Sequence, residues 1–375
     1  MNSRPIIEPS MMIEQAESLP KLITDHVRII DNEVQKFISD LNGRNVEHLY
    51  VTGCGDSYHA ALAAEMAFEN IANINCEPVN GLRFLGYTAD HLLDNSIVMG
   101  VSASGSSARI VEAIKAVKKI GVLTVGVTGN LESPIAMNAE LVISVDIPFI
   151  GWSPGVRTYE ASLLGLYIAA IRLGQYKDQL DEKEANSLIK ELLSLSDVIL
   201  ETNKISKEIS KKAARNFKDS PAILFLGSGP NFGTALFSAA KICESCGLIS
   251  FGQDLEEFAH VEGLCYPDDL PVVIFVAEGK SHWRAVEIAN YGKALGKRVM
   301  VVATENDDIF NEDFNFSVPL PGNVREEFSP LYYHLISDFL AGYLAEELGR
   351  KLFRSDQNRT STTVSSNIQL DTRHD

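Results

Sequence analysis

The feature that most constrains the fold of this chain is an internal repeat. The run SIVMGVSASGSSARIVEAIKAVKKIGVLTVGVTGN, which begins at Ser96, aligns with PVVIFVAEGKSHWRAVEIANYGKALGKRVMVVATEN, which begins at Pro271. Upstream of each run a second unit recurs, with HLYVTG leading into Gly53-Cys54-Gly55 and AILFLG leading into Gly227-Ser228-Gly229. In each unit an apolar strand pattern precedes a glycine-containing turn and an amphipathic helix pattern, which is typical of parallel sheets. The sequence therefore predicts an α/β chain with two similar domains that arose by duplication.

The two copies differ at one turn between strand and helix. The first copy reads Ser102-Ala103-Ser104-Gly105-Ser106-Ser107, whereas the second reads Ala277-Glu278-Gly279-Lys280-Ser281. A serine-rich turn that opens a helix offers backbone N–H groups, hydroxyls and the positive end of the helix dipole, which together favour an anion such as phosphate. The alternative is a helix N-cap, for which one serine would be enough. We therefore expect the first domain to hold the phosphate group of a ligand and the second to supply other groups.

Composition and charge exclude several classes of protein. The chain has 375 residues, enough for two domains with full cores. Its formal net charge of −17 argues against nucleic acid as a partner, because phosphate backbones need a basic surface. No apolar run approaches the ~20 residues of a membrane span, and the first residues lack a signal-peptide pattern. The five cysteines are scattered and odd in number, which favours a reducing compartment, so we expect a cytoplasmic protein without a membrane partner.

The pattern of apolar and charged residues divides the chain into five parts. Residues 1–44 are expected to form helices, 45–175 the first α/β domain, 176–215 a charged helical connector and 216–351 the second α/β domain. Residues 352–375 form a polar tail with no core pattern. We expect this tail either to be disordered or to fold over a site as an arm.

A candidate proton-transfer group lies in the helix pattern that follows the second glycine turn. Lys241 and Glu244 are three residues apart and share a helix face. Apolar neighbours can raise the pKa of a carboxyl group such as that of Glu244, which suits it to move protons near neutral pH. The simpler interpretation from these residues alone is a solvated ion pair.

Two further segments carry candidate residues. His260 lies in the segment DLEEFAHVE, whose carboxylates would favour an imidazolium able to donate a proton to a sugar oxygen; a structural role is the alternative. The segment Gly155-Val156-Arg157-Thr158 follows a strand pattern and opens a long helix, at the edge where open α/β sheets bind ligands. Arg157 could steady a polyhydroxylic substrate or pair with Glu160.

At these motifs the chain resembles the sugar isomerase (SIS) domain family over about residues 45–350, and within it the isomerase half of glucosamine-6-phosphate synthase and related deglycases and deaminases. The resemblance implies two SIS domains, each a three-layer αβα sandwich around a parallel sheet. The serine turn matches the family's S-x-S-G-x-[ST] phosphate loop. The resemblance assigns substrate or phosphate binding to Cys54, Gly55, Asp56, Ser57, Ser102, Ala103, Ser104, Ser107, Val156, Arg157 and Thr158. It assigns the proton shuttle to Glu244, ring opening to His260 and a supporting role to Lys241.

The sequence departs from the synthase pattern in three places. We expect no glutaminase domain with a leading catalytic cysteine, and hence no release of ammonia from glutamine. The segment 357–363, which matches the synthase tail, lacks the lysine that forms a Schiff base there. His260 is followed by Val261-Glu262 where the family usually has Gly-Pro, which bears on the substrate more than on the proton chemistry.

The resemblance implies an enzyme that moves a proton between C1 and C2 of a 6-phosphosugar, most simply one that carries nitrogen. Aldose–ketose isomerisation, deamination and deglycation all fit, because each passes through an enediol or enolamine. The family implies no metal and no organic cofactor, and a homodimer whose active site takes its histidine from the neighbouring subunit. The alternative is a non-catalytic phosphosugar sensor, which would keep the serine loop but need neither Glu244 nor His260.

Overall fold

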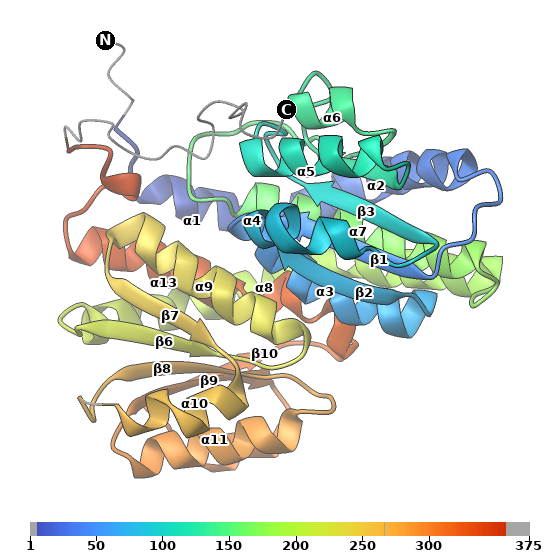
Figure 1. Ribbon diagram of the computed structural model, residues 1–375. Coiled ribbons are helices and arrows are strands. Elements are labelled where there is room, and N and C mark those ends of the chain that lie inside the picture. The colour runs from blue at the N-terminus through green and yellow to red at the C-terminus, as the bar shows by residue number, and fades with distance from the viewer. Residues whose placement is uncertain (1–5, 266, 358–375) are drawn as a thin grey trace. The chain divides into compact units, whose positions relative to one another are not determined.

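Two compact units, each built on a five-stranded parallel sheet, make up the computed structural model, which describes residues 6–265 and 267–357 (Figure 1). The first unit contains Leu22–Pro148 and Thr158–Leu193. The second unit contains the described residues up to Lys21, Phe149–Arg157, and the described residues from Ser194 onward. This architecture confirms the α/β fold with two similar domains.

The sheet of the first unit has the strand order β2-β1-β3-β4-β5. Its strands are β1 (His48–Gly53), β2 (Asn75–Asn80), β3 (Ser96–Val101), β4 (Leu123–Thr128) and β5 (Leu141–Ser144). Its helices are α2 (Leu19–Asp40), α3 (Asp56–Ala72), α4 (Gly81–Arg83), α5 (Ala108–Lys119), α6 (Pro134–Asn138) and α7 (Arg157–Tyr176), of which α2 and α7 begin in residues of the second unit. A π-helical turn (Phe84–Thr88) and a 3-10 turn (Ala89–His91) follow α4. Helices α5 and α6 pack on one face of the sheet and α3 on the other, as three layers require.

The sheet of the second unit has the order β10-β9-β8-β6-β7. Its strands are β6 (Ala222–Leu226), β7 (Ile249–Gln253), β8 (Pro271–Val276), β9 (Arg298–Thr304) and β10 (Phe316–Leu320). Its helices are α1 (Ser10–Glu17), α9 (Pro230–Cys246), α10 (Leu255–His260), α11 (His282–Ala294), α12 (Pro330–Tyr333) and α13 (Leu335–Glu347). Short 3-10 turns occupy Glu262–Leu264, Asp308–Asn311, Glu326–Phe328 and Leu352–Arg354. Figure 1 shows α9 and α13 on one side of this sheet and α10 and α11 on the other.

The duplication extends to backbone detail. Read from the opposite edge, the second sheet has the same connectivity as the first. Helices α3 and α9 both have 17 residues, and their N-cap glycines have nearly the same dihedral angles: Gly55 has φ 55° and ψ −128°, and Gly229 has φ 56° and ψ −134°. Both helices end on a left-handed residue, Asn73 and Gly247. The loops that follow β1 and β6 are therefore equivalent positions of one ancestral unit.

Apolar strands buried on both faces form the cores. All six residues of β8 and all six of β4 are buried, as expected for strands covered by helices on both sides. A buried ion pair supports the first unit from outside its sheet: Arg172 of α7 binds both carboxylate oxygens of Asp31 of α2, at 2.7 and 2.8 Å.

The segment predicted as a connector forms most of one 36-residue helix, α8 (Glu182–Phe217), which passes from the first unit into the second after Leu193. At the other end of the described chain, the Leu352 N–H donates to the Ile7 carbonyl and the Ile7 N–H donates to Ser355 Oγ. The remainder of the predicted tail, from Asn358 on, lies outside the described residues. Within residues 6–265 and 267–357, no helix combines the length and the apolarity needed to cross a bilayer.

Candidate functional site

The serine loop of the first unit connects the carboxyl end of β3 to the first turn of α5. Ser102 is buried, and its hydroxyl lies 3.2 Å from that of Ser107, the N-cap residue of α5. The Ser104 and Ser106 hydroxyls lie 2.9 Å apart on the more open side of the loop. The loop therefore brings the four hydroxyls together in two pairs.

Glycine is required at the centre of this loop. Gly105 has φ +65°, and a Cβ placed on it would lie 1.9 Å from Ser133 Oγ and 2.8 Å from Thr128 Oγ1. Its N–H donates to the Ser102 carbonyl at 2.9 Å, and its own carbonyl accepts from the Ile135 N–H at 3.0 Å. These contacts fix the loop against β4 and α6, so its shape does not depend on a ligand.

Free backbone donors make the loop suited to an anion. Within the described part of the chain, the N–H groups of Ser107, Ala108 and Arg109 donate to no other group. They open α5, a helix of 12 residues, where the dipole adds positive potential. The Arg109 guanidinium pairs with Glu112 at 3.0 Å, so the N–H groups and hydroxyls are the principal anion ligands here.

The second predicted loop lies on the neighbouring strand, since β1 pairs with β3. The Gly55 carbonyl accepts hydrogen bonds from the N–H groups of Tyr58 and His59. Asp56 and Ser57 form the first turn of α3. Burial raises the pKa of the Cys54 thiol, which packs against a small apolar cluster under the serine loop. Cys54 thus has the environment of a packed thiol rather than of a reactive thiolate.

The third predicted segment is mostly buried. Val156 has no exposed surface, and Arg157, 7% exposed, donates from Nη1 to Ser18 Oγ of the residue after α1 at 2.6 Å. The backbone N–H of Arg157 also donates to Gln15 Oε1. Thr158, at the start of α7, is exposed. The guanidinium thus has a packing role toward the N-terminal helix, whatever else it binds.

The proposed proton-transfer pair of the second unit is not a solvated surface pair. Lys241 of α9 is fully buried, and its Nζ lies 2.6 Å from Glu244 Oε2, while the Glu244 side chain is 39% exposed. The ammonium also lies 4.8 Å from the ring centre of Phe237, one turn earlier on the helix. Phe237 carries no motif that marks it in the sequence, although its i,i+4 spacing from Lys241 is a usable signal. The arrangement holds one carboxylate oxygen against a fixed buried cation and leaves part of the carboxylate open to solvent.

His260 lies at the end of α10 on the surface of the second unit. Its side chain is 71% exposed, and Nε2 lies 3.1 Å from Glu256 Oε1. Glu256 in turn accepts two hydrogen bonds from Arg284 of α11, at 2.7 and 2.9 Å. The imidazole therefore bonds to a carboxylate that is itself anchored, and it remains accessible.

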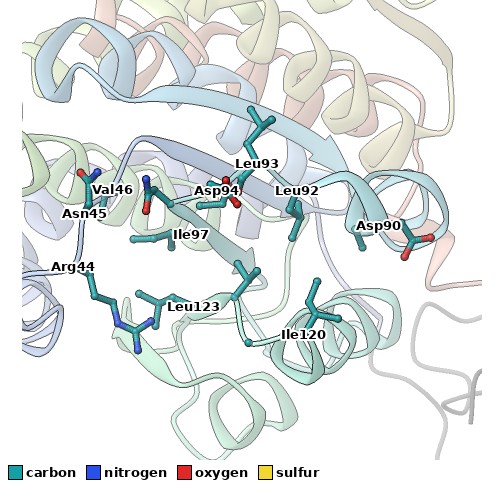
Figure 2. A pocket seen from close by; sticks show the side chains of 15 residues that line it. Arg44, Asn45, Val46, Asp90, Leu92, Leu93, Asp94, Ile97, Ile120 and Leu123 are labelled. Atoms are coloured by element: carbon teal, nitrogen blue, oxygen red, sulfur yellow. Dashed lines mark hydrogen bonds between the residues drawn. The ribbon is translucent and has the colours of Figure 1, made fainter.

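A cavity of about 520 Å³ lies at the opposite edge of the first sheet, around the amino ends of β3 and β4 (Figure 2). It contains none of the predicted site residues. Figure 2 shows Arg44 near Leu123 on one side of the cavity, and Leu92, Ile120 and Asp90 on the other. Ligands of open α/β sheets bind at the carboxyl ends of the strands, where the serine loop lies, whereas this cavity lies at the amino ends. The serine loop is therefore the better anion site, despite the size of the cavity.

Comparisons with known proteins bear on the family and the fold of this chain. Residues 44–172 match the family model of the SIS domain. Over 331 residues the chain is 25% identical to a glutamine–fructose-6-phosphate aminotransferase (isomerizing) of Nostoc sp., with 85% of this chain and 52% of the relative covered. The chain thus spans about half the length of the curated relatives it matches.

Solved structures share the fold. The C-terminal domain of the glucosamine-fructose-6-phosphate aminotransferase from Francisella tularensis superposes with a TM-score of 0.80 at 16% identity, covering 90% of this chain and 96% of that one. A glucosamine-6-phosphate deaminase from Thermotoga maritima gives a TM-score of 0.65 at 20% identity, covering 89% and 95%. These structures confirm the two-domain α/β fold, and the family-model match of residues 44–172 confirms the resemblance to the SIS domain family.

Proposed function

We propose that this chain is an enzyme acting on a 6-phosphosugar. The premise is that residues 44–172 form an SIS domain within a phosphosugar-isomerase type of fold. Its reaction moves a proton between C1 and C2 of the open-chain sugar. The contact between Lys241 and Glu244 carries the proposal, since a sensor would need the serine loop but not a carboxylate fixed by a buried cation.

The phosphate group binds in the serine loop. The hydroxyls of Ser102, Ser104 and Ser107 and the N–H groups at the start of α5 supply its ligands, with Ser57 of the adjacent loop as a further donor. Cys54, Gly55, Asp56 and Ala103 line these loops through their backbone. Of the third segment, Val156 and Arg157 are buried, so Thr158 is the residue that borders the sugar. This arrangement needs few cations, which agrees with the acidic character of the chain.

Glu244 is the base that removes the proton from one carbon and returns it to the other. Lys241 fixes one carboxylate oxygen, and the exposed part of the carboxylate is the part available to a substrate. His260, assisted by Lys241, opens the sugar ring by moving a proton between O5 and the anomeric oxygen. No step in this scheme calls on a metal or an organic cofactor.

The substrate carries nitrogen in this proposal. Two of the proteins compared above are named for an amino-sugar product or substrate, glucosamine-fructose-6-phosphate aminotransferase and glucosamine-6-phosphate deaminase. An enolamine intermediate leads to isomerisation, deamination or deglycation according to which bond breaks next. The exposure of His260 supports a homodimer in which this side chain completes the site of a second copy.

The test is a proton NMR time course of the purified chain in deuterated buffer. The panel is fructose 6-phosphate, glucosamine 6-phosphate and a 6-phosphorylated fructosyl-amino acid. We expect loss of the C1 or C2 proton signal for one of them, and the product identifies the reaction. Glu244→Gln should abolish exchange and leave binding nearly unchanged. Glu201→Gln is the matched control, because Glu201 forms an i,i+3 pair with Lys204 at 2.6 Å on the exposed surface of α8.

Two results would overturn the enzyme. If all compounds bind and none exchanges, the chain is a phosphosugar sensor. If Glu244→Gln exchanges as fast as the unaltered chain, the base is another residue.

A further inference from the structure

The second unit has a loop pair equivalent to the phosphate-binding pair of the first. The loop after β6 corresponds to the loop after β1, with matching N-cap glycines, and the loop after β8 corresponds to the serine loop after β3. Strands β6 and β8 are neighbours, as β1 and β3 are. The second unit therefore inherits the backbone frame of an anion site without its serines.

A carboxylate of the same chain lies in this frame. Glu326 approaches Gly279 so closely that a Cβ on that glycine would lie 2.0 Å from both Glu326 Cδ and Oε2. The Lys280 N–H donates to Glu326 Oε2 at 3.3 Å, and Glu326 Oε1 lies 3.6 Å from the Cβ position of Gly229 in the other loop. The Glu326 side chain thus touches both loops of the pair, although it comes from the segment just before α12.

Two other polar side chains of these loops are engaged elsewhere. Ser228 donates to Asp254 Oδ2 at 2.7 Å, and Glu278 accepts from the Thr304 hydroxyl at 3.0 Å. Burial raises the pKa of the Glu326 carboxyl group, while the Lys280 N–H and the nearby positive charge of Lys280 act to lower it. The backbone donor of Lys280 and this cation are the features that an incoming anion would use, and Glu326 now occupies the donor.

We propose that the second unit retains an anion-binding cradle and that the Glu326 carboxylate occupies it in place of phosphate. Glu326 is then a specificity determinant: it restricts phosphate binding to the serine loop, so that a phosphosugar cannot bind in the equivalent but non-productive position. Once the Glu326 carboxylate is removed, the cradle should bind inorganic phosphate or a phosphate monoester. The cradle concerns the second unit alone, whereas the specificity role of Glu326 rests on the phosphate site proposed above for the serine loop.

The test counts phosphate sites in the full-length chain by calorimetric titration with inorganic phosphate. The unaltered chain should bind one phosphate, and Glu326→Ala should bind two. In a Ser102→Ala, Ser104→Ala background the first site is lost, and adding Glu326→Ala should restore one phosphate. We expect the affinity for phosphate of this second site to rise roughly tenfold or more, the effect of freeing one charged hydrogen bond. Glu327→Ala is the matched control, since it removes the same charge from the same turn without vacating the cradle.

Each outcome decides one proposal. If folded Glu326→Ala gains no phosphate site relative to Glu327→Ala, the cradle does not exist. If both variants gain equally, the effect is one of net charge and the inference is wrong. If the serine-loop background still binds phosphate, the proposed phosphate site fails, but the comparison of the two glutamate variants still decides the inference. Should Glu326→Ala not fold, Glu326→Gln replaces it, with an affinity for phosphate expected between those of the Ala variant and the unaltered chain.

Discussion

The Lys241 ammonium, fully buried, lies 2.6 Å from a Glu244 carboxylate that is 39% exposed. The asymmetry means that the lysine cannot be hydrated if it loses its partner, whereas the glutamate can. In Lys241→Met the carboxylate would keep its water but lose its fixed orientation. We therefore expect proton exchange to fall by roughly tenfold to a hundredfold, with the free energy of unfolding changed by less than about 1 kcal/mol, because methionine fills a similar volume without a buried charge. Urea unfolding and deuterium exchange measured on the same variant check this, and a parallel loss of both would assign Lys241 to stability alone.

Gly105 decides whether the serine loop can form. Alanine at this position has to adopt φ +65° and displace Ser133 Oγ, which would lie 1.9 Å from its Cβ. We expect Gly105→Ala to abolish phosphate binding, because the loop must move away from β4 and α6. Gly121→Ala is the control: Gly121 has φ +80° with nothing within 4 Å of its Cβ position. It should cost only about 1 kcal/mol of backbone strain and leave binding intact. Titration with inorganic phosphate distinguishes the two, and equal behaviour would show that the loop is not held by Ser133.

Much of this molecule could be predicted from sequence because its signals are local. The repeated apolar runs gave two parallel sheets, and the serine cluster located the loop that exposes the N–H groups of Ala108 and Arg109. The burial of Arg157 could not be predicted, because its partner Ser18 lies far away in the chain and no motif joins them. Glu326 was missed for the same reason: 46 residues separate it from the Lys280 N–H it accepts. Contacts between residues far apart in the chain form only once the backbone has folded. They leave no periodic pattern or fixed spacing in a single sequence from which they could be predicted.

The buried pair of Asp31 and Arg172 should be a major source of stability in the first unit. Arg172 also donates to the half-buried Gln175 and Asn186, so its removal takes this donor from the buried Asp31 carboxylate and from two further acceptors. We expect Arg172→Met to lower the free energy of unfolding by about 3 to 5 kcal/mol, and the double variant Asp31→Asn, Arg172→Met to recover part of the loss. Lys204→Met breaks an exposed pair with Glu201 and should cost less than about 0.5 kcal/mol. Equal costs for the two single variants would contradict the assignment.

Mixing of inactive variants tests whether His260 serves a second copy. If the active sites of a homodimer combine Glu244 of one chain with His260 of the other, a mixture of Glu244→Gln and His260→Ala chains contains dimers with one intact site. After random exchange of subunits, activity should return to about a quarter of that of the unaltered chain. The control is each variant mixed with itself, which should stay inactive. No recovery from a mixture shown to exchange subunits would place both residues of a site in one chain.

Glu65 makes the stability of the first unit depend on pH. Burial, reinforced by the neighbouring charges of Glu69 and Glu77, raises the pKa of Glu65 to about 7. In the unfolded chain the carboxyl group ionises near its ordinary value of 4.5, whereas the folded chain keeps the proton until about pH 7. The folded chain holds this proton more tightly than the unfolded chain does. The contribution of Glu65 to the free energy of unfolding is therefore highest at low pH and falls as the pH rises through the interval between the two pKa values.

Glu65→Gln removes this titration and keeps the shape of the side chain. Between pH 4.5 and pH 8 the free energy of unfolding of the variant should rise by roughly 1 to 2 kcal/mol relative to that of the unaltered chain. Only the glutamate ionises in this half-buried site, and solvent screening reduces the effect of the full pKa shift. Urea unfolding of both chains at the two pH values gives this difference directly, and titrations common to both cancel. A difference that stays constant with pH would mean that Glu65 ionises as readily in the folded chain as in the unfolded one.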